Sequence, residues 1–158
     1  MTMQWWDIAP LGWENILVCL VCGTLVGLER QLRGKPVGIR TSSLIILGSY
    51  CFLELSCAIS PQAADQARVL GQLVTGIGFL GAGVMMTQNG VVIGATSAAT
   101  VWVLAALGAM IGLNLSVPAI VLTFFILGIL VGVDWLERKF VHLQRGVHKP
   151  FGDRHGAE

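Results

Sequence analysis

Residues 65–86 of the chain read DQARVLGQLVTGIGFLGAGVMM, and this stretch decides the fold. Its start is charged and polar, and the hydrophobic part that follows is rich in glycine. In water, each glycine would weaken a helix by roughly 1 kcal/mol relative to alanine. In lipid, a backbone without internal hydrogen bonds is far more costly, and small residues let neighbouring helices approach closely. The stretch is therefore predicted to form a buried, central membrane helix with four packing glycines: Gly76, Gly78, Gly81 and Gly83.

The composition of the whole chain fits a membrane setting. Of its 158 residues, 54% are hydrophobic and only 12% are charged, which leaves too little polar surface for a soluble domain of this size. The apolar residues also gather in blocks instead of alternating. We therefore expect an all-α fold, a polytopic membrane helical bundle. A net charge of +1 gives no indication of nucleic-acid binding, and none is expected.

Five hydrophobic blocks are long enough to cross a bilayer. They cover residues 12–28, 41–59, 65–86, 92–113 and 118–133. The first block is close to the lower length limit, so a reentrant segment remains an alternative there. No lysine or arginine precedes Arg30, so a secretory signal peptide is not expected and the first block should stay in the protein.

The positive charges set the predicted topology. They concentrate in residues 29–41 and again after residue 133, and the positive-inside rule places both regions in the cytoplasm. Four crossings between the two regions satisfy this rule, so about five spans put the N-terminus outside and the C-terminus in the cytoplasm. We expect a transmembrane domain over residues 1–136 and a short basic cytoplasmic tail over residues 137–158.

Polar residues at the ends of the blocks are the first functional candidates. Glu29 and Arg40 lie against the ends of the first two blocks, where partial desolvation would strengthen an ion pair that clamps the two helices together. Asp65, Arg68 and Gln72 share one face of the third helix. They form either a charge clamp at the start of the helix or a polar vestibule that feeds a path along its glycines. We hypothesise inner and outer polar clusters that bracket a packed core of the third and fourth segments.

Residues inside the blocks give weaker signals. Glu54 lies within the second block, where a carboxylate must be protonated, paired with a positive charge or in contact with water. It is also near enough to the outer end for its side chain to reach the membrane interface. Glu54 and Asp65 are the weak candidates for a metal ligand. Cys19 and Cys22 have the spacing of a redox or metal-binding pair, but no histidine or second cysteine pair accompanies them at ligand spacing. We therefore expect both to be small buried hydrophobic residues. Neither a cofactor nor an enzyme activity is expected, since no nucleophile and base pair stands out.

Three motifs together carry a family resemblance. They are GTLVGLERQLRGKPVGIRT over residues 23–41, the stretch at 65–86, and VVIGATSAATVWVLAALGAMIG over residues 91–112. The chain resembles the MgtC/SapB family of bacterial inner-membrane proteins. This resemblance implies a multi-pass protein of the bacterial inner membrane that is linked to growth at low magnesium. The matching polar residues are Glu29, Arg30, Arg40, Thr41, Asp65, Arg68, Gln72, Thr96 and Ser97.

The chain also departs from the family pattern. Longer members carry a soluble C-terminal domain, so a short form without it is expected here. GATSAA stands at residues 94–99, where the pattern more commonly has a GLTTAA-like run.

Two functional classes remain open from the sequence. The first is a regulator of other membrane proteins or of ion balance, in contact with the lipid bilayer and with a second copy or another membrane protein. The alternative is an ion transporter or channel, with Mg²⁺ as one candidate ion. Mg²⁺ prefers carboxylates, and no acidic cluster appears within a block, so a magnesium pore would need an oligomer that supplies one acid per subunit.

Overall fold

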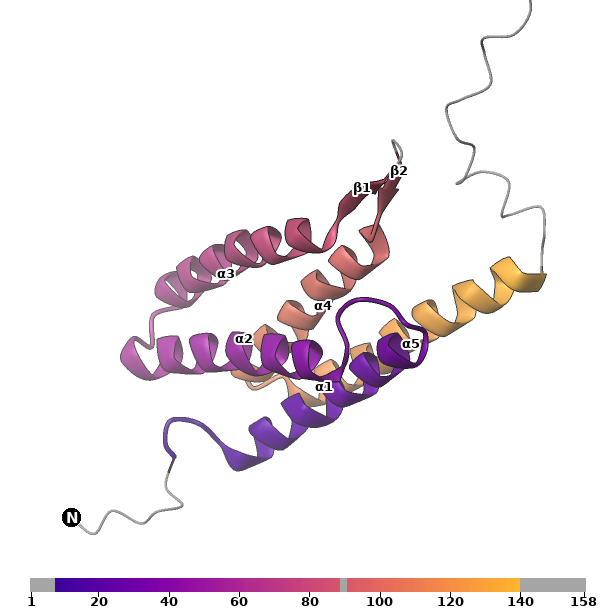
Figure 1. Ribbon diagram of the computed structural model, residues 1–158. Helices are drawn as coiled ribbons and strands as arrows, with labels where there is room; N and C mark the ends of the chain where they lie inside the picture. Colours follow the sequence, from indigo (N-terminus) through magenta and orange to yellow (C-terminus); the bar gives the residue numbers. More distant parts are fainter. Residues whose placement is uncertain (1–7, 89–90, 140–158) are drawn as a thin grey trace, which may run out of the picture.

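The computed structural model describes residues 8–88 and 91–139. Within them it contains five α-helices and one short antiparallel hairpin (Figure 1). The elements are α1 (Trp13–Leu32), α2 (Ile39–Ile59), α3 (Ala63–Val84), β1 (Met86–Gln88), β2 (Val91–Ile93), α4 (Ala95–Gly112) and α5 (Ser116–Lys139). All five helices are long and apolar enough to cross a membrane, which confirms the prediction of about five spans.

The helices run alternately up and down the bundle. Figure 1 shows the loop at residues 33–38, the hairpin and the end of α5 toward one end, and the loops at residues 60–62 and 113–115 toward the other. We call the first the inner end and the second the outer end. The basic loop at 33–38 and the end of α5 therefore share one end of the bundle.

Helix α1 is longer than the predicted first block. It continues through Glu29 and Arg30 to Leu32, so the densest charged motif begins on a regular helix. The helix then closes with a Schellman motif around Gly34, whose φ of +63° suits glycine. In this motif the Lys35 amide donates to the Arg30 carbonyl at 2.9 Å, and the Gly34 amide donates to the Gln31 carbonyl at 3.1 Å. With 20 residues in one helix, α1 has the length of a full span.

The central helix is α4 and not α3. In the membrane-spanning part of α4, 56% of the residues are buried, against 11% in α3. Helix α4 contacts α2 and α3 extensively, and α1 packs between α2 and α5. The prediction that α3 is a buried, central helix is therefore wrong for the single chain, because within the described residues α3 contacts α4 and α2 along one side.

The glycines of α3 explain this position. Only Gly81 is close to another helix, with the Ala98 carbonyl oxygen 3.7 Å from where its Cβ would lie. A Cβ on Gly76, Gly78 or Gly83 would meet nothing within 4 Å in the described chain. Three of the four predicted packing glycines therefore do not pack against the described part of this chain.

A hairpin interrupts the all-α prediction between α3 and α4. Met86 pairs with Ile93, and Gln88 pairs with Val91. Residues 89 and 90, which connect the two strands, lie outside the described residues. The hairpin delays the start of α4 from the predicted residue 92 to Ala95, since residues 91–93 form the second strand.

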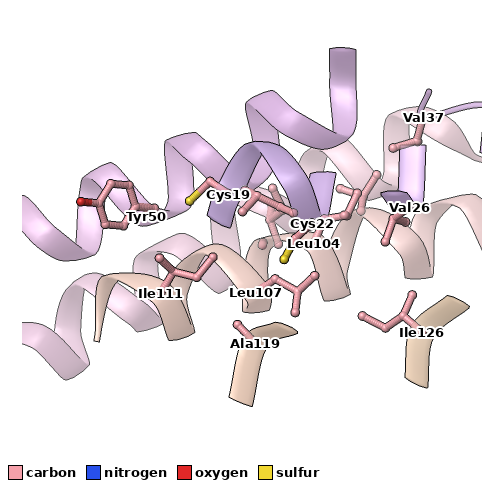
Figure 2. Close-up of a cluster of buried hydrophobic side chains, with 14 residues drawn as sticks. Cys19, Cys22, Val26, Val37, Tyr50, Leu104, Leu107, Ile111, Ala119 and Ile126 are labelled. Carbon is pink, nitrogen blue, oxygen red and sulfur yellow. The ribbon is translucent and has the colours of Figure 1, made fainter. Parts of the chain in front are cut away.

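The core of the bundle is apolar along most of its length. Figure 2 shows Cys19, Cys22, Leu104 and Leu107 gathered between Tyr50 toward one end and Val37 toward the other. Cys19, Leu104 and Leu107 are completely buried, and Cys22 is 1% exposed. The prediction that the α1 cysteines are small buried hydrophobes is thus consistent with their positions.

Helix α5 runs three residues past the predicted end of the transmembrane domain at residue 136 and reaches Lys139. The rest of the predicted basic tail, residues 140–158, lies outside the described residues.

Candidate functional site

The inner end of the bundle holds a polar cluster, which we call the inner cluster: Glu29, Arg30, Arg33 and Ser97. Arg30 and Ser97 are buried, whereas Glu29 and Arg33 are partly buried. Arg30 of α1 is only 4% exposed, and its guanidinium donates a hydrogen bond to the Ser97 hydroxyl in the first turn of α4. Ser97 is itself 2% exposed. The bond joins two residues that are 67 positions apart in the sequence, so the motif at residues 23–41 meets the motif at residues 91–112 here.

Glu29 pairs within its own helix. Its Oε1 lies 2.6 Å from Nε of Arg33, one turn further along α1. The contact is a close ion pair, although its angle is not that of an aligned hydrogen bond. The predicted Glu29–Arg40 clamp is wrong, because Glu29 turns toward Arg33 while Arg40 is exposed in the first turn of α2.

The inner cluster is not fully satisfied by protein groups. Among the described residues, neither Oε2 of Glu29 nor Nε of Arg30 has a hydrogen-bond partner, although both atoms are shielded from solvent. An unpaired buried donor or acceptor is costly, so these two atoms are expected to find water or a neighbouring group in the membrane. Buried charges of this kind are uncommon outside functional or structurally essential positions.

Other motif residues near the inner end lie on the surface. Thr41 and Thr96 are both exposed, so neither joins the buried cluster. Thr96 offers its backbone carbonyl to the hydroxyl of Thr100 at 2.8 Å, which is the local back-bonding expected of hydroxyls in helices. The fourth helix therefore contributes Ser97 alone from the predicted pair Thr96 and Ser97.

A second polar cluster, the Asp65 clamp, lies at the outer end, where α3 begins. The Asp65 carboxylate accepts a hydrogen bond from the Arg68 guanidinium at 2.8 Å and another from the Ser60 hydroxyl at 2.6 Å. Asp65 is also in the first turn of α3, where a negative charge suits the helix dipole. This geometry matches the predicted charge clamp. Gln72 is exposed, one turn beyond Arg68.

A third group of polar contacts was not predicted from the sequence. The Gly12 amide donates to the Tyr50 hydroxyl at 2.8 Å, and the Ser116 hydroxyl donates to the Asn15 side-chain oxygen at 2.9 Å. These bonds join the start of α1 to α2 and to the start of α5. Tyr50 was a usable signal, because it is the single tyrosine of the chain and a phenol in an apolar block needs a polar partner.

Glu54 lies on α2, one turn beyond Tyr50. It is half-buried, and among the described residues its Oε2 has no hydrogen-bond partner. The two weak metal candidates, Glu54 and Asp65, are not joined in a coordination set. No group of three or more His, Cys, Asp or Glu side chains within the described part of the chain is placed to hold a metal ion.

The hollows along the bundle are lined by apolar side chains. A groove of about 720 Å³ runs along α5 and is lined by Phe124, Phe125, Gly128 and their neighbours. A smaller hollow of about 200 Å³ lies between α1 and α5, beside Cys22 and Thr123. Among the described side chains, no charged one lines either hollow, so both suit a lipid chain or an apolar helix face better than an ion.

Comparison with known proteins gives a consistent result. Residues 16–139 match the MgtC family. The chain is 37% identical over 140 residues to a protein of Escherichia coli K12 named "Putative magnesium transporter YhiD", covering 82% of this chain and 65% of that protein. It is 40% identical over 113 residues to Protein MgtC of Salmonella typhimurium, and this match covers 72% of this chain and 48% of that protein. It is 37% identical over 130 residues to Protein MgtC of Brucella abortus, and this match covers 81% of this chain and 54% of that protein.

The chain therefore spans about half to two thirds of the length of these relatives. No solved structure matches it significantly.

Proposed function

The chain belongs to the MgtC family, and from this premise we propose that it is a bacterial inner-membrane protein of magnesium homeostasis that regulates other membrane proteins. In this proposal the chain acts by lateral contact within the membrane. It does not itself conduct an ion through its interior.

One observation carries the proposal: the interior between the polar ends is packed mainly with apolar side chains, and the polar residues buried among them, such as Ser49 and Thr123, carry only small hydroxyls. From the Tyr50 contacts at the outer end to the inner cluster, the helices enclose buried residues such as Cys19, Leu104 and Leu107 (Figure 2). An ion needs a continuous series of oxygen ligands or water to replace its hydration shell. Mg²⁺ loses its water reluctantly and prefers carboxylates, which the core of the described chain lacks.

The sides of the bundle support contact with another protein. The outer faces of α3 and α5 are open, and their glycines at residues 76, 78, 83, 128 and 132 leave room for a neighbouring helix. Small residues at such positions allow close helix approach in lipid. A regulator that docks beside its target would use faces of this kind.

The proposal includes a topology. With the inner end in the cytoplasm, the basic residues of the 33–38 loop and the end of α5 obey the positive-inside rule. This orientation places the N-terminus outside and the inner cluster near the cytoplasmic surface. A reporter fused after Glu158 should then read as cytoplasmic, and a periplasmic signal would contradict the orientation.

We assign the inner cluster a holding role in this regulation. The contact between Arg30 and Ser97 fixes the inner ends of α1 and α4 together, so it can set the shape of the cytoplasmic surface that a target would meet. At the outer end, the contacts of Asp65 with Arg68 and Ser60 would hold the start of α3 in place in the same way.

The test combines a transport assay with a growth assay. Purified protein in liposomes should give no flux of Mg²⁺, Na⁺, K⁺ or H⁺ above protein-free vesicles, while the same chain supports growth of a deletion strain at low magnesium. Ser97→Ala should reduce growth support, and Thr96→Ala, an exposed neighbour, is the matched control. Mg²⁺ flux that Asp65→Asn or Glu54→Gln abolishes in folded protein would favour the transporter alternative and overturn the regulator proposal.

A further inference from the structure

The outward side of α3 carries a regular pattern of small and polar residues. They are Arg68, Gly71, Gln72, Thr75, Gly78 and Ala82, which we call the α3 outer face, and all six are exposed. Their spacing of three and four residues places them in one stripe along the helix. Since the stripe faces away from α4, nothing in the described chain covers it.

Gln72 makes this stripe unusual for a surface that faces lipid. It lies one helical turn beyond Arg68, inside the apolar part of α3, and has no hydrogen-bond partner among the described residues. Lipid tails offer no hydrogen bond, whereas glutamine side chains commonly bond across paired membrane helices. The Thr75 hydroxyl, by contrast, already donates to the Gly71 carbonyl at 3.0 Å. Gln72 is therefore the polar group that needs an external partner.

We propose that the α3 outer face binds the same face of a second copy, in a parallel two-fold dimer. All copies insert in the same orientation, so a two-fold axis along the membrane normal brings equal residues to equal depths. Gln72 then meets Gln72 of the second copy, and an amide is self-complementary because it has both donors and an acceptor. Gly71 and Gly78 lie seven residues apart, which suits a close left-handed crossing of two helices.

The charges at the start of α3 are complementary in the same arrangement. Arg68 is 73% exposed in its side chain and Asp65 is 34% exposed, so each can also reach the opposite charge of the second copy. The open face of α5 differs in this respect, because its groove is lined by large apolar side chains such as Phe124 and Phe125 and not by charges. In the dimer, the α5 face therefore remains open to lipid or to the apolar helix of a target protein. The inference does not depend on the regulator proposal, since a dimer is compatible with either function.

The test measures association in lipid. Copies that carry donor or acceptor fluorophores at the C-terminus are mixed in liposomes over a wide range of protein-to-lipid ratios. We expect energy transfer that fits a monomer–dimer equilibrium. Gly78→Leu should weaken the dimer by more than roughly tenfold because it blocks close approach, and Gln72→Leu should weaken it roughly 3- to 30-fold through the lost interhelical bond.

The matched control is Gly128→Leu on α5. A Cβ on Gly128, like one on Gly78, would meet nothing within 4 Å, so both variants should fold with the unfolding midpoint of the natural chain. Gly128→Leu should leave the dimer unchanged. Protein that is monomeric at every ratio, or association equally sensitive to Gly128→Leu and Gly78→Leu, would overturn the proposal.

A cross-linking measurement fixes the register. In a variant whose four cysteines are replaced, Thr75→Cys should form a disulfide-linked dimer in the membrane, whereas Phe125→Cys on α5 should not. Cross-linking through Phe125→Cys alone would assign the interface to α5 and overturn the α3 outer face.

Discussion

Helices α3 and α4 are both rich in small residues, and they use them in opposite ways. In α4, Gly108 and Gly112 lie against α2, and their Cβ atoms would collide with the Ile46 carbonyl oxygen and with the Leu53 Cβ. In α3, most glycines face outward and touch no other part of the described chain. A glycine-rich membrane helix therefore indicates close packing, but the packing partner can be the same chain or another one.

The largest effect is expected where α4 meets α2. Gly108→Leu would place a side chain into the backbone of α2 and against the Ser49 Cβ, which a Cβ at residue 108 would already approach to 2.6 Å. We expect loss of at least about 3 kcal/mol of unfolding free energy, and little folded protein in detergent. Thermal unfolding monitored by circular dichroism measures this. A variant as stable as the natural chain would show that α4 is not the central helix.

A GxxxG pair in α1, Gly23 and Gly27, and another in α5, Gly128 and Gly132, sharpen the comparison. A Cβ on Gly27 of α1 would lie 2.5 Å from the Ile39 Cα, whereas one on Gly132 of α5 would meet nothing within 4 Å. Gly27→Ala should therefore cost about 2 kcal/mol, because backbone cannot move aside easily. Gly132→Ala should change stability by less than about 1 kcal/mol. Equal losses in denaturant titrations of the two variants would contradict the arrangement of α1 and α5.

The buried polar contact between α1 and α4 gives an intermediate effect. Ser97→Ala removes the hydroxyl that accepts from Arg30 and leaves a buried guanidinium with one partner fewer, so we expect a loss of about 1–3 kcal/mol. Thr96→Ala, next to it but exposed, should stay within about 0.5 kcal/mol. If Ser97→Ala were also neutral in the same unfolding assay, Arg30 would not depend on this contact.

The smallest effect is expected at the exposed start of α3. Asp65→Asn weakens a pair in which the Arg68 side chain is 73% exposed, so the unfolding free energy should fall by less than about 1 kcal/mol. The loss of unfolding free energy caused by Asp65→Asn should be smaller still at high salt, because salt screens exposed ion pairs. A large loss that salt does not change would mean that the Asp65 clamp is buried, for example by a second copy.

The fold was predictable from the sequence as far as it depends on local hydrophobic length. Five apolar blocks correspond to five helices, because each must satisfy its own backbone in lipid. The extension of α1 to Leu32 was missed because charged residues resemble a loop, while here tertiary contacts of Arg30 and the cap at Gly34 keep the helix regular. The hairpin before α4 was missed because its strands are short and continue the hydrophobic block.

The candidate site was predictable only in part. The motifs pointed to Glu29, Arg30 and Ser97, and the structure brings these residues to one end of the bundle. The partner of Glu29 was not predictable, since Arg33 and Arg40 carry the same charge and only the three-dimensional arrangement separates them. The third segment was predicted to be the central helix, and α4 takes that place in the structure, because hydropathy and glycine content do not say which helix lies in the middle.

The most direct test of this account compares one substitution at two glycines. Gly108→Ala in α4 and Gly76→Ala in α3 are each measured for unfolding free energy in the same lipid nanodiscs, with one copy per disc. We predict a loss of about 2–3 kcal/mol for Gly108→Ala and no loss, or a gain of up to about 1 kcal/mol, for Gly76→Ala. Equal losses at both positions would contradict the account, because α3 would then be packed inside the chain as tightly as α4.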